Sequence, residues 1–188
     1  LEAGQLRLIG DPKQRYVEDP VRMLRAVRFA SKLGLRIHPE AEQPIAECAD
    51  LLEGIPPARL FEEVLKLFMG GCALQTFESL RHYNLFRYLF PQTDHVLDTR
   101  ETDYPHSFIM HALKNTDQRL NEGNSVTPGF LLAALLWEPM RLIADEHMTH
   151  GMSEMEAVQL ASDAVISRQI SNTSMPRRFS QMARDIWQ

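Results

Sequence analysis

Apolar residues recur every three or four positions along most of this chain, which is the spacing of an amphipathic helix. The clearest case is the stretch 20–33, where five apolar side chains fall on one face: Met23, Ala26, Val27, Ala30 and Leu33. Pro20 suits the first helical position, where its missing N–H is not needed, and Gly34 supplies an end. The pattern predicts a short helix with a buried stripe that other helices must cover.

The same spacing predicts seven further helices. Their expected ranges are 39–52, 57–69, 72–83, 104–121, 128–138, 154–170 and a last one that Pro176 opens. Ser153 and Glu156 form a capping box at one of these starts. Because no alternating, strand-like stretch of useful length follows residue 10, the predicted fold class is all-α.

The chain is expected to form two small helical subdomains, 10–92 and 93–188. The polar stretch 92–107 is predicted to be a loop or linker between them. Residues 1–9 have a short alternating pattern without a preceding turn or cap, and we interpret them as the trailing edge of a larger unit. In the stretch before Pro91, Phe86, Tyr88 and Phe90 alternate, and packing in the core is favoured there over stacking on bases.

The composition is that of an ordinary soluble globular protein, with 44% hydrophobic and 24% charged residues among 188. Cys48 and Cys72 are isolated, which argues against a zinc site or a disulfide framework and favours a reducing cytoplasm. The seven histidines include no pair at the spacing of a helical zinc site. No apolar run reaches the roughly 18 residues that span a bilayer. The expected location is cytoplasmic.

Charge is distributed unevenly along the chain. The net charge is −5, but residues 7–36 hold eight Lys/Arg side chains against three acids, so this segment carries +5 and the remainder −10. A triphosphate or an RNA 3′ end would be attracted to such a segment.

Asp19, Arg22, Arg25 and Arg28 step by three along the predicted helix, which places an acceptor beside a row of donors. The pairing edges of adenine and cytosine present an amino donor beside a ring-nitrogen acceptor, whereas guanine and uracil present the reverse. The pair Asp19 and Arg22 would therefore favour A and C, while Arg25 and Arg28 could meet phosphate oxygens. The alternative interpretation is an acidic helix cap with an ion pair on a solvated face.

A second cluster of charges lies on the polar side of the helix predicted at 57–69. It consists of Arg59, Glu62, Glu63 and Lys66. On spacing alone, an exposed ladder of ion pairs, each worth a few tenths of a kcal/mol, is the simplest interpretation.

Two stretches resemble a known family. The run GDPKQRYVEDPVRMLRAVRFASKLG is similar to the nucleotide-reading segment of the class II nucleotidyltransferases, which are the poly(A) polymerases and CCA-adding enzymes of bacteria. Its EDxxR motif is Glu18, Asp19 and Arg22 here. The run IPPARLFEEVLKLF resembles the family's next motif, in which an arginine and a pair of acids brace the nucleotide-reading helix. The similarity extends over the whole chain, and both stretches are closest to the poly(A) polymerases.

The resemblance implies a role for each charged residue. Asp19 and Arg22 would read the base of the incoming nucleotide, with Arg25 and Arg28 beside them. Glu18, Arg59, Glu62 and Glu63 would support that helix. Without a nucleotide, Arg22 is expected to point into solvent.

The implied activity is addition of AMP from ATP to RNA 3′ ends, which requires carboxylates that hold Mg²⁺. In the family these come from a DxD pair after a Gly-Ser turn, and this sequence contains neither. The chain is therefore expected to be the neck (10–92) and the RNA-binding body (93–188) of such an enzyme, with residues 1–9 a remnant of the catalytic domain. The magnesium would be bound by that domain, and the isolated chain would be inactive.

The expected partners are ATP and the RNA 3′ end, and RNA chaperones and degradosome components are candidate protein partners. Two alternatives stay open at this point. The first is the same role in a CCA-adding enzyme, since Asp19 and Arg22 fit both bases. The second is a stand-alone helical module that binds RNA or protein.

Overall fold

The structure, a computed structural model, describes residues 4–99 and 104–188, with side chains from residue 106 onward in the second range. Ten α-helices make up most of the described residues, so the all-α prediction is confirmed. Two strands of two residues each, β1 (Gln5–Leu6) and β2 (Arg36–Ile37), pair in parallel beside the helices.

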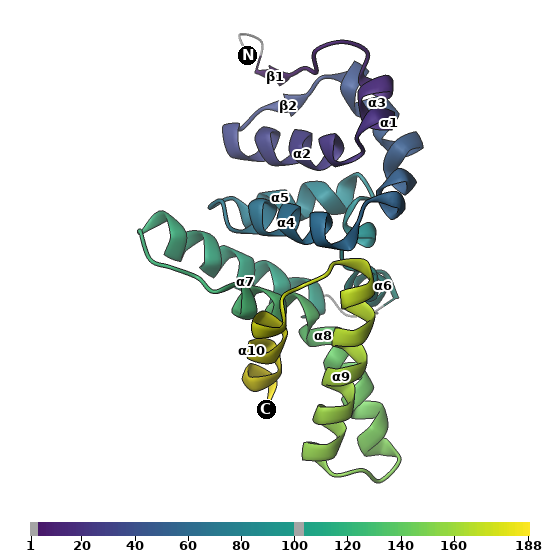
Figure 1. The fold of residues 1–188 in the computed structure, drawn as a ribbon. Coiled ribbons are helices and arrows are strands. Elements are labelled where there is room, and N and C mark those ends of the chain that lie inside the picture. The colour runs from purple at the N-terminus through teal and green to yellow at the C-terminus, as the bar shows by residue number, and fades with distance from the viewer. Residues whose placement is uncertain (1–3, 100–103) are drawn as a thin grey trace.

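The first half of the chain forms two stacked layers (Figure 1). One layer holds β1, β2 and three helices, and α4 and α5 lie against it. The elements are α1 (Pro12–Glu18), α2 (Val21–Leu33), α3 (Pro39–Cys48), the 3-10 turn η1 (Ala49–Gly54), α4 (Pro57–Phe68) and α5 (Ala73–His82).

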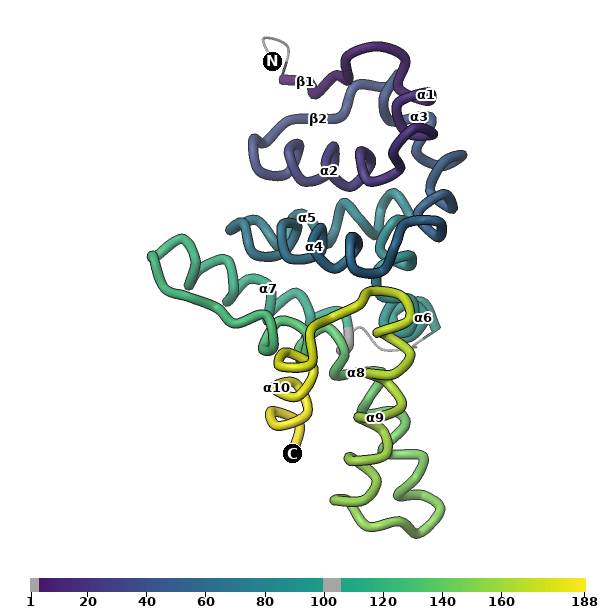
Figure 2. Tube along the Cα trace, viewed as in Figure 1, coloured from purple at the N-terminus to yellow at the C-terminus, as the bar shows by residue number. Residues whose placement is uncertain are grey.

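The second half continues from a short 3-10 turn into five helices. The elements are η2 (Phe86–Tyr88), α6 (Pro91–Thr99), α7 (Tyr104–Asn121), α8 (Pro128–Thr149), α9 (Glu154–Asn172) and α10 (Arg177–Trp187). In Figure 2, α8 and α9 run side by side as a long hairpin, and α10 lies against α8. Gly129 permits that close packing, because a Cβ there would lie 2.5 Å from Met182 Sδ.

Local signals set most of the helix ends. Helix α2 ends at Gly34, which has the left-handed φ of 65° that glycine adopts without strain. Helix α9 begins after Ser153, whose side chain accepts from the Glu156 N–H, as the capping box predicted. Helix α8 begins after Thr127, which accepts from the Phe130 N–H.

Two expectations about the elements were wrong, and one helix was missed. Helix α1 was not predicted, although Asp11 and Pro12 form an ordinary cap and first position. The stretch 92–107 is not a loop: α6 covers Pro91–Thr99 and α7 starts at Tyr104, while residues 100–103 lie outside the described part. Helix α8 continues to Thr149, well beyond the predicted end at 138.

The continuation of α8 through Pro139 has a specific cause. Proline has no N–H, so the Leu135 carbonyl four residues earlier loses its helical donor. The Thr93 hydroxyl of α6 donates to that carbonyl at 2.7 Å, and Thr93 is fully buried. A side chain from another helix thus replaces the missing backbone donor and fixes α6 to α8.

The buried apolar side chains form one cluster that extends from Tyr16 to Trp187. Phe86 and Phe90 are fully buried in it, so the prediction that this aromatic stretch packs in the core is confirmed for both. Polar contacts also cross residue 93: the Gln169 side chain donates to the Leu89 carbonyl at 2.8 Å, and the Ser174 N–H donates to the Pro57 carbonyl at 3.0 Å. The division into two subdomains stays a prediction.

None of the helices within residues 4–99 and 104–188 is both long enough and apolar enough to cross a membrane.

Replacing Thr93 by valine should destabilise the fold. The change keeps the shape but leaves the buried Leu135 carbonyl without a donor, which should cost about 1–3 kcal/mol of unfolding free energy. Urea denaturation would measure it. The control is Thr99→Val, because within the described part of the chain the exposed Thr99 hydroxyl bonds only to the His95 carbonyl of its own helix. Equal stability of the two variants would contradict this account of Pro139.

Candidate functional site

The candidate site lies where α1 ends and α2 begins. Asp19 has an extended backbone there, with φ −149° and ψ 96°, and its N–H donates to the Arg15 carbonyl. Its Oδ1 accepts from the Val21 N–H at 3.3 Å, which is the first free N–H of α2. The break between the two helices therefore holds the Asp19 carboxylate at the positive end of α2.

Arg59 of α4 reaches across to this carboxylate. Its Nη2 lies 2.7 Å from Asp19 Oδ2, and the Asp19 side chain is 20% exposed. Burial alone would raise the pKa of Asp19. The hydrogen bond and charge of Arg59, the Val21 N–H and the charge of Arg25 outweigh burial, so the pKa of Asp19 is lowered below its ordinary value. The carboxylate is held in its ionised, accepting form.

Arg22 does not pair with Asp19. Its Nη1 donates at 3.0 Å to the Arg15 carbonyl and at 3.0 Å to Glu18 Oε2. The expectation that Arg22 points into solvent is therefore wrong, because α1 supplies two acceptors that fix the guanidinium beside the Asp19 turn. Both bonds use Nη1, which leaves Nε and Nη2 as donors toward a ligand.

Glu63 of α4 is the buried charge of the site, with 2% of the residue exposed. Its Oε1 lies 3.4 Å from Arg25 Nη2 and 3.6 Å from Lys66 Nζ. Its Oε2 is buried without a hydrogen-bond partner among the described residues. A buried carboxylate with long, one-sided contacts contributes little to stability, but it restricts where the Arg25 guanidinium can lie.

Two of the sequence-predicted residues make no hydrogen bond or ion pair with this cluster among the described residues. Arg28 places its guanidinium over the Phe29 ring, 4.7 Å from the ring centre. Glu62 is exposed, and within the described part of the chain it forms no hydrogen bond or ion pair. The cluster thus joins Asp19, Arg22 and Glu18 of the α1–α2 turn with Arg25, Arg59 and Glu63.

The main contribution that the sequence did not reveal is the Arg15 carbonyl, which holds Arg22. The Asp11-Pro12 start of α1 was the available signal for the helix that presents it. Over the described residues, no group of three or more His, Cys, Asp and Glu side chains is placed to hold a metal ion.

The Arg59–Asp19 ion pair should contribute measurably to stability. Arg59→Met should lower the free energy of unfolding by about 1 kcal/mol. This is a small loss for a broken charged pair, because the Arg59 side chain is 39% exposed and solvent screens the interaction. Urea denaturation would measure it, with Arg168→Met on the exposed surface of α9 as the matched control. In the double variant Arg59→Met/Asp19→Asn, the loss of unfolding free energy should be smaller than the sum of the losses in the two single variants. Fully additive losses would show that the pair has no coupling energy.

Comparison with known proteins supports the family that the motifs indicated. A family model described as "Probable RNA and SrmB- binding site of polymerase A" matches residues 34–97. A second, described as "Polymerase A arginine-rich C-terminus", matches residues 150–188.

Curated relatives match over the whole chain. It is 44% identical over 189 residues to "Poly(A) polymerase I" of Salmonella typhi and 45% identical over 190 residues to that of Escherichia coli O157:H7. The chain spans 41% of the length of each. It is also 40% identical over 98 residues to the "CCA-adding enzyme" of Levilactobacillus brevis, an alignment that covers 52% of this chain and 25% of that enzyme. The chain is therefore similar over its whole length to bacterial poly(A) polymerases, and it spans about two fifths of the length of these relatives.

Proposed function

We propose that this chain, as part of a longer protein, reads the base of ATP and binds RNA in an enzyme that adds AMP to RNA 3′ ends. The relatives named as poly(A) polymerases, similar along the entire chain, support the activity of the whole protein. The observation that carries the role of this part is the Asp19 carboxylate, which Arg59 keeps ionised and oriented beside Arg22.

The hydrogen-bonding capacity of these two side chains fits adenine. An ionised carboxylate can accept about four hydrogen bonds. Asp19 accepts one from Arg59 and one from the Val21 N–H, so it can also accept from the adenine amino group. Arg22 can donate from Nε or Nη2 to the neighbouring ring nitrogen. Guanine would place a carbonyl against Asp19 and an N–H against Arg22, and both sides would be unsatisfied.

Arg25 is suited to a different part of the nucleotide. Its side chain is 40% exposed, and Glu63 restrains it from behind. A guanidinium in that position can donate to phosphate oxygens without distinguishing one base from another.

Phosphoryl transfer also requires metal ions, and the described residues of this chain do not provide a suitable group of ligands. We propose that Mg²⁺ is bound by carboxylates of the longer protein. The part of the reaction assigned to this chain is then to orient the base, to restrain the nucleotide and to bind RNA.

CCA addition is the second candidate, because the amino and ring-nitrogen edges of adenine and cytosine are alike. The CCA-adding relative aligns with only about half of this chain, whereas the poly(A) polymerases align with all of it. The extent of the similarity favours poly(A) addition.

In the full-length enzyme, Asp19→Ala should lower selectivity for ATP. Losing a hydrogen bond to a charged group should cost about 1.5–3 kcal/mol, which corresponds to a decrease of roughly 10- to 150-fold in kcat/KM for ATP. Steady-state incorporation of ATP and GTP into the same RNA primer would measure it, and the ATP-over-GTP ratio should fall with the rate.

Arg25→Ala is the matched comparison within the same site. It should weaken incorporation of both nucleotides by a similar factor and leave their ratio unchanged. An unchanged ATP-over-GTP ratio in Asp19→Ala would contradict the base-reading assignment.

A further inference from the structure

A groove lies on the side of α2 opposite to the candidate nucleotide site. One cavity of about 430 Å³ is lined by the buried side of α2, by β2 and by α5. A second, of about 440 Å³, is lined by α3 and residues 82–88. Both are lined by Glu42, His82 and Tyr83, so the two hollows adjoin each other, and we call the pair the α3–α5 groove.

The position of Ser31 shows which side of α2 this is. Ser31 follows Arg22 by nine residues, about two and a half helical turns, so the two side chains leave α2 in opposite directions. Ser31 lines the groove and is 6% exposed, and its hydroxyl has no hydrogen-bond partner among the described residues.

Aromatic rings form much of the groove wall. His82 and Tyr83 meet edge to face with ring centres 4.8 Å apart, and the Arg87 guanidinium lies 5.5 Å from the centre of the Tyr88 ring. The turn η2 carries Arg87 and Tyr88, and the buried Phe86 anchors it. Tyr88 is therefore held in place, and flat bases can stack on exposed aromatic rings of this kind.

The charges of the groove favour an anionic strand. Arg36 and Arg87 line its two halves, and among the described residues neither forms an ion pair. Glu42 is the one carboxylate in the lining of the two cavities. It can accept from the amino group of adenine or cytosine, while the arginines meet phosphates.

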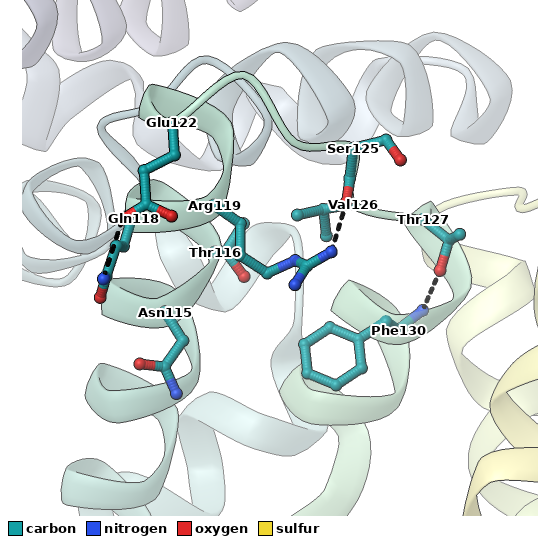
Figure 3. Close-up of a pocket in the computed structure, with 9 residues that line it drawn as sticks. All are labelled: Asn115, Thr116, Gln118, Arg119, Glu122, Ser125, Val126, Thr127 and Phe130. Carbon is teal, nitrogen blue, oxygen red and sulfur yellow. Dashed lines mark hydrogen bonds between the residues drawn. The ribbon is translucent and has the colours of Figure 1, made fainter.

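A different cavity, of about 660 Å³ between α7 and α8, is less suited to this ligand (Figure 3). Its polar groups already bond to one another: Arg119 donates to the Ser125 carbonyl at 3.3 Å, and Gln118 donates to Glu122 at 3.1 Å. The lining of this cavity contains one aromatic ring, Phe130. It also contains one arginine and one carboxylate, Glu122, so the two charges offset each other.

We propose that the α3–α5 groove binds single-stranded RNA, with bases against His82, Tyr83 and Tyr88 and phosphates at Arg36 and Arg87. This rests on the proposed function and locates its RNA-binding part. All five residues lie within the 34–97 match to the family model whose description includes a probable RNA-binding site. RNA and ATP would then be bound on opposite sides of α2.

The test is binding of a short, fluorescein-labelled oligoadenylate to the 188-residue chain, measured by anisotropy across a salt series. Arg36→Ala and Arg87→Ala should each raise the Kd by about three- to tenfold. The double variant should reduce the slope of log K against log salt by about 1.4, since each phosphate contact on a single strand contributes about 0.7. The matched control is Arg119→Ala, which should bind like the wild type. A 4-thiouridine-containing strand should cross-link to the groove aromatics.

Each contrary result has a distinct meaning. Unchanged binding by both groove variants, or an equal loss in Arg119→Ala, would overturn the groove but leave the proposed function standing. Competition by an acidic peptide as strong as that by RNA would overturn RNA as the ligand. No RNA binding by the wild-type chain would overturn both the groove and the RNA-binding part of the proposed function, while base reading is tested separately by the Asp19 variants.

Discussion

The ion pair between Arg59 of α4 and Asp19 at the start of α2 sets the geometry of the candidate site. Asp19 lies at a break between two helices, where the backbone alone does not fix its side chain. Arg59 supplies the second contact, and α4 is itself held by the buried side chains Leu60, Val64 and Phe68. The Ser174 N–H also bonds to Pro57 at the start of α4. The last third of the chain therefore supports a carboxylate near its beginning.

Glu63 shows a cost of the same arrangement. A carboxylate that is 2% exposed, with one oxygen unpaired and two contacts beyond 3.3 Å, is not what stability alone would favour. Glu63 contacts the Arg25 guanidinium from the buried side, and this contact restrains the orientation of Arg25. We interpret Glu63 as a positioning residue whose value depends on what Arg25 binds.

Signals that lie within one element were sufficient to predict much of the fold. Gly34 ended α2, and the Ser153 cap began α9, because the backbone conformation or the hydrogen bond is local. Pro139 shows where this fails: proline normally ends a helix, and the Thr93 hydroxyl, 46 residues earlier in the chain, supplies the donor that Pro139 lacks. The candidate site shows the same contrast between what local sequence signals reveal and what depends on tertiary structure. The motifs identified Asp19, Arg22 and Arg59, but the contact of Arg22 with the Arg15 carbonyl depends on how α1 turns into α2.

The most direct test of the account is a ¹³C NMR titration of the Asp19 carboxyl group in the wild-type chain and in Arg59→Met. In the wild type, Asp19 should have a pKa below the ordinary aspartate value, because the Arg59 hydrogen bond and charge outweigh burial. Arg59→Met removes the hydrogen bond and the charge that counteract burial, so the pKa of Asp19 should rise toward or above that value. An Asp19 pKa that is the same in both proteins would contradict the claim that α4 holds this carboxylate ionised.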